Sequence, residues 1–264
     1  MLAVERDFYK LSKTTPDDIK LLRWLIVDNA TTDAKRMHEK FLTTMTLPID
    51  FVEANRHQLN NIDKIDEALD EYMTNALEDE HMRIESRFVP HLEEIKSGDL
   101  SFYENSDGCL DFLMFISAQY MRTKGIKVRT IELIKEKNGQ DLSRIWGLMS
   151  LMYATNIMTS LFFERKLRKL ELIHNRTCAE FITGDQPAIN LLGTRPLPPQ
   201  SLSIYYPVSP DLALILSEVN QEPAFTTESL TATGVAELNK RIVDASHSQV
   251  FARTETALMP FSDK

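Results

Sequence analysis

The sequence predicts an α+β protein that is mainly helical. Apolar residues recur at helical spacing through most of residues 1–170, which indicates a helical bundle. Two of these predicted helices are apolar on every side, as is typical of helices at the centre of a bundle. In residues 171–264, short apolar runs separated by proline-rich turns predict a small mixed or antiparallel strand region. We expect this region to be packed on the bundle as part of one structural unit.

Composition narrows the class of protein further. The chain has 264 residues, a formal charge of -9 and two cysteines, Cys109 and Cys178. The cysteines lack the paired spacing of a zinc site or a disulfide framework, so a reducing compartment is expected. The first residues carry charges where a signal peptide needs an apolar core, which predicts a cytoplasmic protein. The negative charge disfavours general affinity for the nucleic acid backbone, because phosphate binding depends on a positive surface.

Start and stop signals define the first two helices. Thr15 is a predicted N-cap and Pro16 suits the first helical position, so a helix is expected over residues 15–29. A second, amphipathic helix is expected over residues 32–46. It should end before Pro48, because the residue ahead of a proline disfavours helical backbone.

The third predicted helix covers residues 63–96. Its apolar residues lie on one side before His81 and on another side after it, so we expect a break or bend near His81. Gly98 is a predicted stop, because glycine readily takes the left-handed conformation that ends a helix.

Two more helices are expected at the centre of the bundle. One opens near Ser106, and its apolar residues point in every direction around the axis. The other follows Asp141, a predicted cap, and should continue to about Leu170. Its residues 146–163 carry no charge and reach the length of a membrane helix. They include Asn156 and other polar residues that insert poorly into lipid, so a buried core helix is the preferred interpretation.

The C-terminal region is expected to contain strands and one helix. The predicted helix covers residues 233–245, and the predicted strands cover residues 180–183, 203–206, 212–216 and 249–252. The loop at residues 193–199 reads Gly-Thr-Arg-Pro-Leu-Pro-Pro. We interpret it as a stiff connector, and a polyproline ligand for an aromatic groove is the alternative.

Common catalytic motifs are missing from the sequence. It contains no GxxxxGK[ST], GxGxxG, GxSxG or HExxH pattern, and its six histidines have no metal-ligand spacing. Any active site therefore has to be assembled from residues that are distant in the sequence.

Polar residues on apolar helix faces are the first candidates for such a site. Glu85 lies close to an apolar stripe of its helix, so its carboxylate is expected to be partly buried and to need a partner. Gln119 and Arg122 are neighbours on a predicted central helix. A guanidinium can hold a carboxylate with two parallel hydrogen bonds, so we expect Arg122 to contact Glu85.

Asp185 completes the candidate site. It ends a predicted strand in the block Phe-Ile-Thr-Gly-Asp-Gln-Pro, where Thr183 and Gln186 are candidate ligand-binding residues. If Glu85 and Asp185 converge, they can hold a divalent metal for phosphoester chemistry while Arg122 stabilises charge on a phosphoryl oxygen. Glu85, Arg122 and Asp185 are then the catalytic residues. The alternative, which is the preferred interpretation, is a structural network of ion pairs.

Charge is unevenly distributed along the chain. Residues 63–85 hold nine acids and two bases, whereas residues 122–137 hold six bases and two acids. Four further bases, Arg165, Lys166, Arg168 and Lys169, follow. The basic segments can form a patch for a phosphate-bearing partner, including nucleic acid. The preferred interpretation is that acidic and basic faces lie against one another or in solvent.

Several sequence blocks together resemble the bacterial family catalogued as domain of unknown function 4238. The most specific part is the Thr-Gly-Asp-Gln-Pro block at residues 183–187, followed by Pro-Val-Ser-Pro at residues 207–210. Weaker blocks are Asp-Phe-Tyr at residues 7–9, Ile84-Glu85, Phe115 with Gln119 and Arg122, and Asn239 ahead of residues 245–251. The resemblance covers most of the chain.

The resemblance implies no known activity, since the function of the family is unknown. Members usually carry a His-Tyr-Val-Pro segment ahead of the Asp-Phe-Tyr block, and this sequence does not contain it. If that histidine is catalytic, we expect this chain to be inactive or to act only as a binding partner. The family more often has Asn where Gln186 stands, which keeps an amide beside the acid.

Two functional hypotheses follow from the sequence. The first is an enzyme that acts on a phosphate-containing substrate or nucleic acid, with a divalent metal as cofactor, at Glu85, Arg122 and Asp185. The second is a non-enzymatic interaction or regulatory module of a bacterial defence or toxin system, for which a homo-oligomer is one arrangement.

Overall fold

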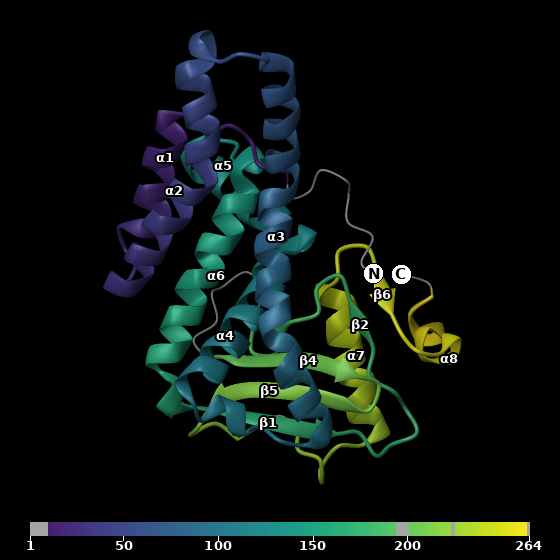
Figure 1. Ribbon diagram of the computed structural model, residues 1–264. Helices are drawn as coiled ribbons and strands as arrows, with labels where there is room; N and C mark the ends of the chain where they lie inside the picture. Colours follow the sequence, from purple (N-terminus) through teal and green to yellow (C-terminus); the bar gives the residue numbers. More distant parts are fainter. Residues whose placement is uncertain (1–9, 194–200, 223–224, 263–264) are drawn as a thin grey trace.

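The computed structural model describes residues 10–193, 201–222 and 225–262. Helices form one side of the molecule, an antiparallel sheet lies beside them, and helix α7 covers the other face of the sheet (Figure 1). The predicted class, α+β and mainly helical, is confirmed. The predicted connector at residues 193–199 lies, apart from Gly193, outside the described residues.

The first helix begins where the sequence predicts. Helix α1, Pro16–Leu22, continues into a π-helical turn, Arg23–Val27. Thr15 caps it: the Asp18 amide donates to the Thr15 hydroxyl at 3.2 Å, and the Thr15 amide donates to the Asp18 carboxylate at 2.6 Å. The two amides are thereby satisfied reciprocally.

The predicted end of the second helix is wrong. Helix α2 runs from Thr32 to Asn55 with Pro48 inside it. Proline has no amide hydrogen, so it leaves the carbonyl four residues earlier, that of Thr44, without its helical donor. The Tyr72 hydroxyl donates to this carbonyl at 2.9 Å. A side chain from the next helix thus replaces the hydrogen bond that the proline removes.

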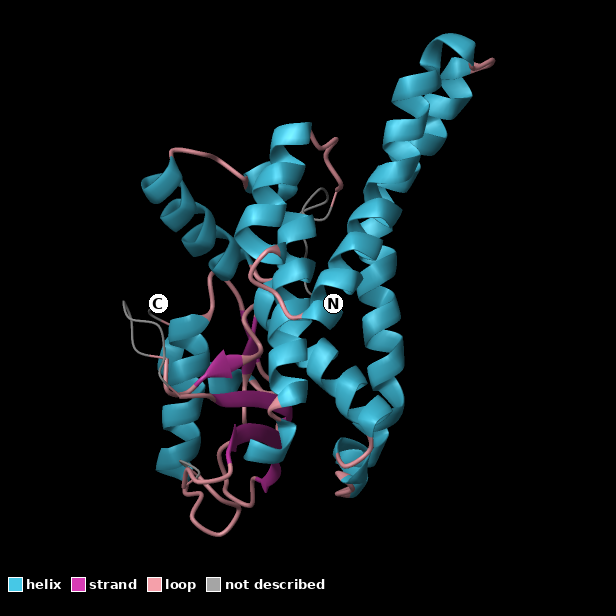
Figure 2. Cartoon of the chain, turned by 90° about the vertical axis from the view of Figure 1, so that its left-hand side faces the viewer, coloured by secondary structure: helices cyan, strands magenta, loops and turns pink. Residues whose placement is uncertain are grey.

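The predicted break near His81 is also wrong. Helix α3 is continuous from Ile62 to Ser97 and ends as predicted at Gly98, whose φ of 88° is left-handed. The apolar face turns because the helix changes partner: its first half packs on α2 through Tyr72, and its second half stacks Phe88 on the next helix. The α2–α3 hairpin projects beyond the rest of the molecule (Figure 2).

Helices α4, Ser106–Met121, and α6, Trp146–Phe163, pack on each other at the centre of the bundle, as predicted. Helix α5, Lys124–Asn138, connects them. Among the described residues, one helical span, Ser143–Phe163, is long and apolar enough to cross a membrane, but 67% of its apolar 18-residue window is buried inside the protein, which is consistent with the core helix of a soluble protein. Helix α6 ends at Phe163 rather than Leu170, because a 3-10 turn at Arg165–Leu167 follows it and strand β1 begins at Arg168.

The sheet is antiparallel with the strand order β1-β5-β4-β3. A separate pair joins β2 to β6, so the strand predicted at residues 180–183 is reduced to a short ladder. The strands are β1, Arg168–His174; β2, Thr183–Gly184; β3, Ile189–Asn190; β4, Ser203–Ser209; β5, Leu212–Glu218; and β6, Val250–Phe251. Helix α8, Glu255–Leu258, follows β6, and 3-10 turns occur at Arg56–Gln58, Ser101–Tyr103, Ser143–Ile145, Arg165–Leu167 and Met259–Phe261.

Strand β5 separates two hydrophobic cores. Its Leu214 and Leu216 belong to the core of the helical bundle, whereas Ala213 and Ile215 belong to a second core under helix α7, Ala232–Ala245. Successive residues of a strand point to opposite faces, so one strand contributes to both cores. The predicted boundary between residues 170 and 171 falls inside β1, and the bundle core continues across it.

The role of Tyr72 can be tested with a double-mutant cycle. We expect Tyr72→Phe to lower the free energy of unfolding by about 1 kcal/mol, because the Thr44 carbonyl loses its donor. In a Pro48→Ala background the loss should be smaller, because the alanine amide supplies that hydrogen bond. Urea denaturation of the four proteins measures both values, and equal losses in the two backgrounds would refute this account of Pro48.

Candidate functional site

The structure pairs two of the predicted site residues. Glu85, on α3, and Arg122, which caps the C-terminus of α4, form a hydrogen-bonded ion pair. The Glu85 side chain is 44% exposed and the Arg122 side chain 17% exposed. The pair therefore lies at the edge of the core, where it joins α3 to α4 next to the sheet.

The groups around this pair are held neutral by burial. His81 is buried, and desolvation together with the positive charge of Arg122 lowers its pKa to about 3. Burial raises the pKa of Tyr206 to about 12. Both side chains are uncharged near neutral pH, because each pKa lies far from 7. Glu85 and Arg122 are thus the charged members of this group.

Gln186 is occupied by contacts within the protein. Its side-chain carbonyl accepts from the Thr123 hydroxyl at 2.5 Å, and its amide donates to the carbonyls of Ala188 at 3.1 Å and Tyr120 at 3.3 Å. Gln186 is 3% exposed. These contacts tie the segment after β2 to the corner between α4 and α5. Gln119, the other predicted ligand-binding amide, is buried in α4.

Asp185 points to a different part of the chain. Its carboxylate accepts from the amides of His247 at 2.7 Å, Ser248 at 2.8 Å and Gln249 at 3.2 Å, and from the Ser248 hydroxyl at 3.0 Å. Several amide donors on one carboxylate order a turn in the way that a helix cap does. Thr183 contributes its backbone to the same region, where it pairs with Phe251.

Asn239 binds the residues that directly precede β2. From helix α7, its carbonyl oxygen accepts from the Ile182 amide at 3.1 Å, and its side-chain amide donates to the Glu180 carbonyl at 2.9 Å. The side chain therefore replaces a neighbouring strand. No role was predicted for Asn239 from the sequence. Its buried place on the apolar face of an amphipathic helix was the available signal, because a buried amide needs hydrogen-bond partners.

The two predicted catalytic carboxylates thus engage different partners: Glu85 binds Arg122, and Asp185 binds the turn at residues 247–249. Within the described part of the chain, no group of three or more His, Cys, Asp or Glu side chains has the geometry to hold a metal ion. The observed contacts favour the structural interpretation of these residues. Their catalytic and metal-binding roles stay predictions.

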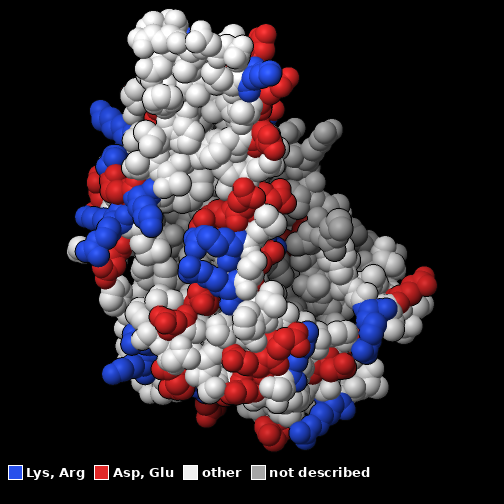
Figure 3. All heavy atoms as spheres, in the orientation of Figure 1, with Lys and Arg blue, Asp and Glu red and all other residues white. Residues whose placement is uncertain are grey.

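Opposite charges lie next to one another on the surface. On the face shown in Figure 3, a basic group lies directly between acidic groups. Several acids of the 63–85 segment have basic partners: Asp66 binds Arg56 at 2.7 Å, and Asp70 binds Lys10 at 2.6 Å. These pairs agree with the preferred interpretation of the charge pattern.

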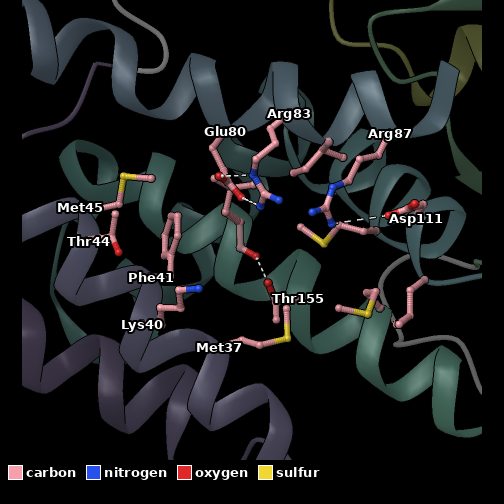
Figure 4. A pocket seen from close by; sticks show the side chains of 15 residues that line it. Met37, Lys40, Phe41, Thr44, Met45, Glu80, Arg83, Arg87, Asp111 and Thr155 are labelled. Atoms are coloured by element: carbon pink, nitrogen blue, oxygen red, sulfur yellow. Dashed lines mark hydrogen bonds and ion pairs between the residues drawn. The ribbon is translucent and has the colours of Figure 1, made fainter. Parts of the chain in front are cut away.

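A cavity lies between helices α2, α3, α4 and α6, and we call it the helix groove (Figure 4). Its volume is about 620 Å³. Cavities that bind small molecules typically measure about 300–1,000 Å³. Its apolar walls are formed by Met37, Phe41, Met45, Ile84, Leu110, Met114, Leu151 and Met158.

Three basic side chains reach the groove, two from α3 and one from α2 (Figure 4). Arg83 donates to Glu80 at 3.0 Å, and Arg87 lies 3.7 Å from Asp111. Lys40 has no ion-pair partner among the described residues. The groove thus combines apolar walls with a mouth that carries three cations and two acids.

Sequence reasoning missed the helix groove because its residues come from four helices. Each of them looks like an ordinary position of an amphipathic helix. Four of the eleven methionines, Met37, Met45, Met114 and Met158, line it. Methionine-rich surfaces are typical of adaptable binding sites, so this content was the available signal.

The fold and the groove define a mainly helical α+β protein with a ligand-sized groove in its bundle. The chain belongs to the family described as protein of unknown function DUF4238, which matches residues 2–256. No curated protein and no solved structure matches the chain significantly.

The structural interpretation of Asp185 predicts a specific outcome. We expect Asp185→Ala to lower the free energy of unfolding by about 1–3 kcal/mol, because three backbone amides lose a charged acceptor. Thermal unfolding with and without Mg²⁺ or Mn²⁺ measures this. Either ion should shift the wild type and the variant equally. A stabilisation that is present only in the wild type would instead support a metal site at Asp185.

The pKa of His81 predicts a pH dependence of stability. Its folded pKa of about 3 lies below its unfolded value, so the unfolded chain binds this proton more readily as the pH falls below about 6.5. His81 should therefore cost about 2 kcal/mol of stability between pH 7 and pH 5. Urea denaturation at both pH values should show a correspondingly smaller loss for His81→Gln. Identical losses would exclude His81 as the cause.

Proposed function

We propose that this protein binds a small amphipathic anion in the helix groove and acts as a ligand-binding module. The observation that carries the proposal is the combination of an apolar cavity with cations at its mouth, of which Lys40 has no ion-pair partner among the described residues. A ligand with an apolar body and a carboxylate or phosphate head group matches both parts.

The apolar walls favour a ligand with an alkyl or aromatic body. Ile84, Leu151 and Met158 are almost fully buried, so they form the floor, whereas Met37 is 43% exposed and lies at the rim. Moving apolar surface from water to such a floor gains about 25 cal/mol per Å². The methionines can adjust their rotamers to the shape of the ligand.

The rim favours a negative head group. Arg83 is paired with a residue of its own helix, and Arg87 lies farther from Asp111 than hydrogen-bonding distance. Both guanidiniums can therefore offer donors to an anion, and Lys40 faces them from α2 (Figure 4). Charge-assisted hydrogen bonds to carboxylate or phosphate are stronger than neutral ones, which gives the site its preference for anions.

The sequence-based hypothesis of phosphoester chemistry at Glu85, Arg122 and Asp185 has less support. The carboxylate of Asp185 already accepts four hydrogen bonds, and Glu85 is paired with Arg122. We therefore assign the protein to the non-enzymatic, regulatory class. A phosphate-bearing molecule remains one class of ligand for the helix groove. Both helices of the α2–α3 hairpin line the groove, so a bound ligand can change how the hairpin packs on the bundle.

We also propose that the protein is located in a bacterial cytoplasm. Both cysteines are free, as is usual in a reducing compartment.

Binding can be tested with 1-anilinonaphthalene-8-sulfonate as a fluorescent amphipathic anion and with laurate as a competitor. We expect the probe to bind the folded protein and laurate to displace it. Lys40→Glu should weaken laurate binding about fivefold to tenfold, because one cation at the mouth becomes an anion. Lys35→Glu makes the same charge change at an exposed position of α2 outside the groove. It should leave the affinity unchanged within about twofold.

The matched pair separates a site from general charge attraction. Equal weakening by the two variants would mean that laurate responds only to net charge. A folded wild type that binds neither the probe nor laurate would contradict the proposed function.

A further inference from the structure

A second hollow lies where α6 passes into the sheet, and it shares no lining residue with the helix groove. We call it the junction hollow and define it by Tyr103, Glu104, Arg165, Lys166, Arg168 and Lys169. Its volume is about 460 Å³. The basic run at residues 165–169 thus gathers around one concave surface.

Two buried donors of the junction hollow have no partner. The Tyr103 hydroxyl and Nε of Arg168 make no hydrogen bond. Tyr103 is 8% exposed, and burial raises its pKa, so the hydroxyl keeps its proton and can donate. Buried polar groups are nearly always paired, so two unpaired donors beside one hollow indicate a missing acceptor.

The guanidinium of Arg168 is held in a fixed orientation. One of its terminal nitrogens donates to Glu164 at 2.6 Å, and the other lies 3.5 Å from Glu218. These acids compensate the charge of Arg168 but leave Nε without an acceptor. The guanidinium therefore lines the hollow in a fixed orientation with one donor left over.

Two further cations of the junction hollow, Arg165 and Lys166, are not held in ion pairs within the described part of the chain. Arg165 lies over the Phe162 ring at 4.1 Å and donates to the Phe162 carbonyl at 2.9 Å, so its charge is positioned by neutral groups. Lys166 has no ion-pair partner among the described residues. Lys169 is paired with Glu171 at 3.2 Å, and Glu104 is the one acid of the lining set.

We propose that the junction hollow binds a phosphate group. Donors reach the hollow from two sides, Tyr103 from the turn after α3 and Arg165, Lys166 and Arg168 from the α6–β1 junction. A tetrahedral phosphate presents several acceptor oxygens in different directions, whereas a carboxylate presents two in one plane. The phosphate can therefore accept from both sides at once. This site is independent of the function proposed for the helix groove.

The phosphate can come from a soluble monoester or from a lipid head group. Large apolar side chains are exposed next to the hollow: Phe163 is 56%, Leu167 66% and Val219 50% exposed. Leu167 and Val219 are adjacent, since the Val219 amide donates to the Leu167 carbonyl at 2.9 Å. Exposed apolar residues beside cations are typical of surfaces that contact anionic lipid, so the test includes both sources.

The test measures binding of inorganic phosphate and glycerol 3-phosphate by calorimetry. In parallel, it measures cosedimentation with phosphatidylcholine vesicles that contain or lack phosphatidic acid. We expect binding in at least one of these two arms. Lys166→Glu should weaken it about tenfold, because a cation becomes an anion at the site. The control Lys137→Glu makes the same charge change on the exposed surface of α5 and should have no effect.

Tyr103→Phe provides a second variant that is expected to fold. It removes one donor that has no hydrogen bond in the protein, so the melting temperature should not fall while phosphate affinity falls. The proposal is overturned if phosphate binds in neither arm. It is also overturned if Lys166→Glu and Tyr103→Phe bind as tightly as Lys137→Glu. Laurate binding to the helix groove should be unchanged in all three variants, which separates the two sites.

Discussion

The fold depends on the burial of β5 on both faces. Leu214 and Leu216 face the helical bundle, and Ala213 and Ile215 face helix α7, so neither core can form completely without this strand. A strand that is buried on both sides has its register fixed by both cores, because a shift of one residue would exchange its two faces. This constraint joins the helical and strand-containing regions and positions the α6–β1 junction that begins the sheet.

Polar residues in the sequence blocks that resemble the family also hold the helical and strand-containing regions in place. Gln186 ties the segment after β2 to the corner between α4 and α5, Asp185 orders the turn ahead of β6, and Asn239 replaces a missing strand neighbour. With these residues engaged in structure, the open surfaces lie elsewhere. The long helices α2 and α3 pack on α4 and α6, but their side chains do not fill the space between the four helices. This space is the helix groove.

Local signals predicted the parts of the fold that local chemistry controls. Thr15 and Gly98 marked helix ends, and the all-round apolar character of α4 and α6 placed them at the centre. The end expected at Pro48 failed because the compensating donor, Tyr72, lies in another helix. Strand β1 was missed because its ladder with β5 depends on residues 38 to 50 positions away. The Glu85–Arg122 contact could be predicted from the chemistry of the two side chains. The helix groove and the junction hollow could not be predicted, because their residues come together only in the three-dimensional structure.

Methionine methyl NMR tests most directly whether the helix groove is a binding site. The spectrum of protein labelled at methionine methyl groups would be recorded during a titration with laurate. The account predicts that the signals of Met37, Met45, Met114 and Met158 shift together, while those of the exposed Met82 and Met259 stay in place. Shifts confined to Met82 and Met259, or no shift at saturating laurate, would contradict it.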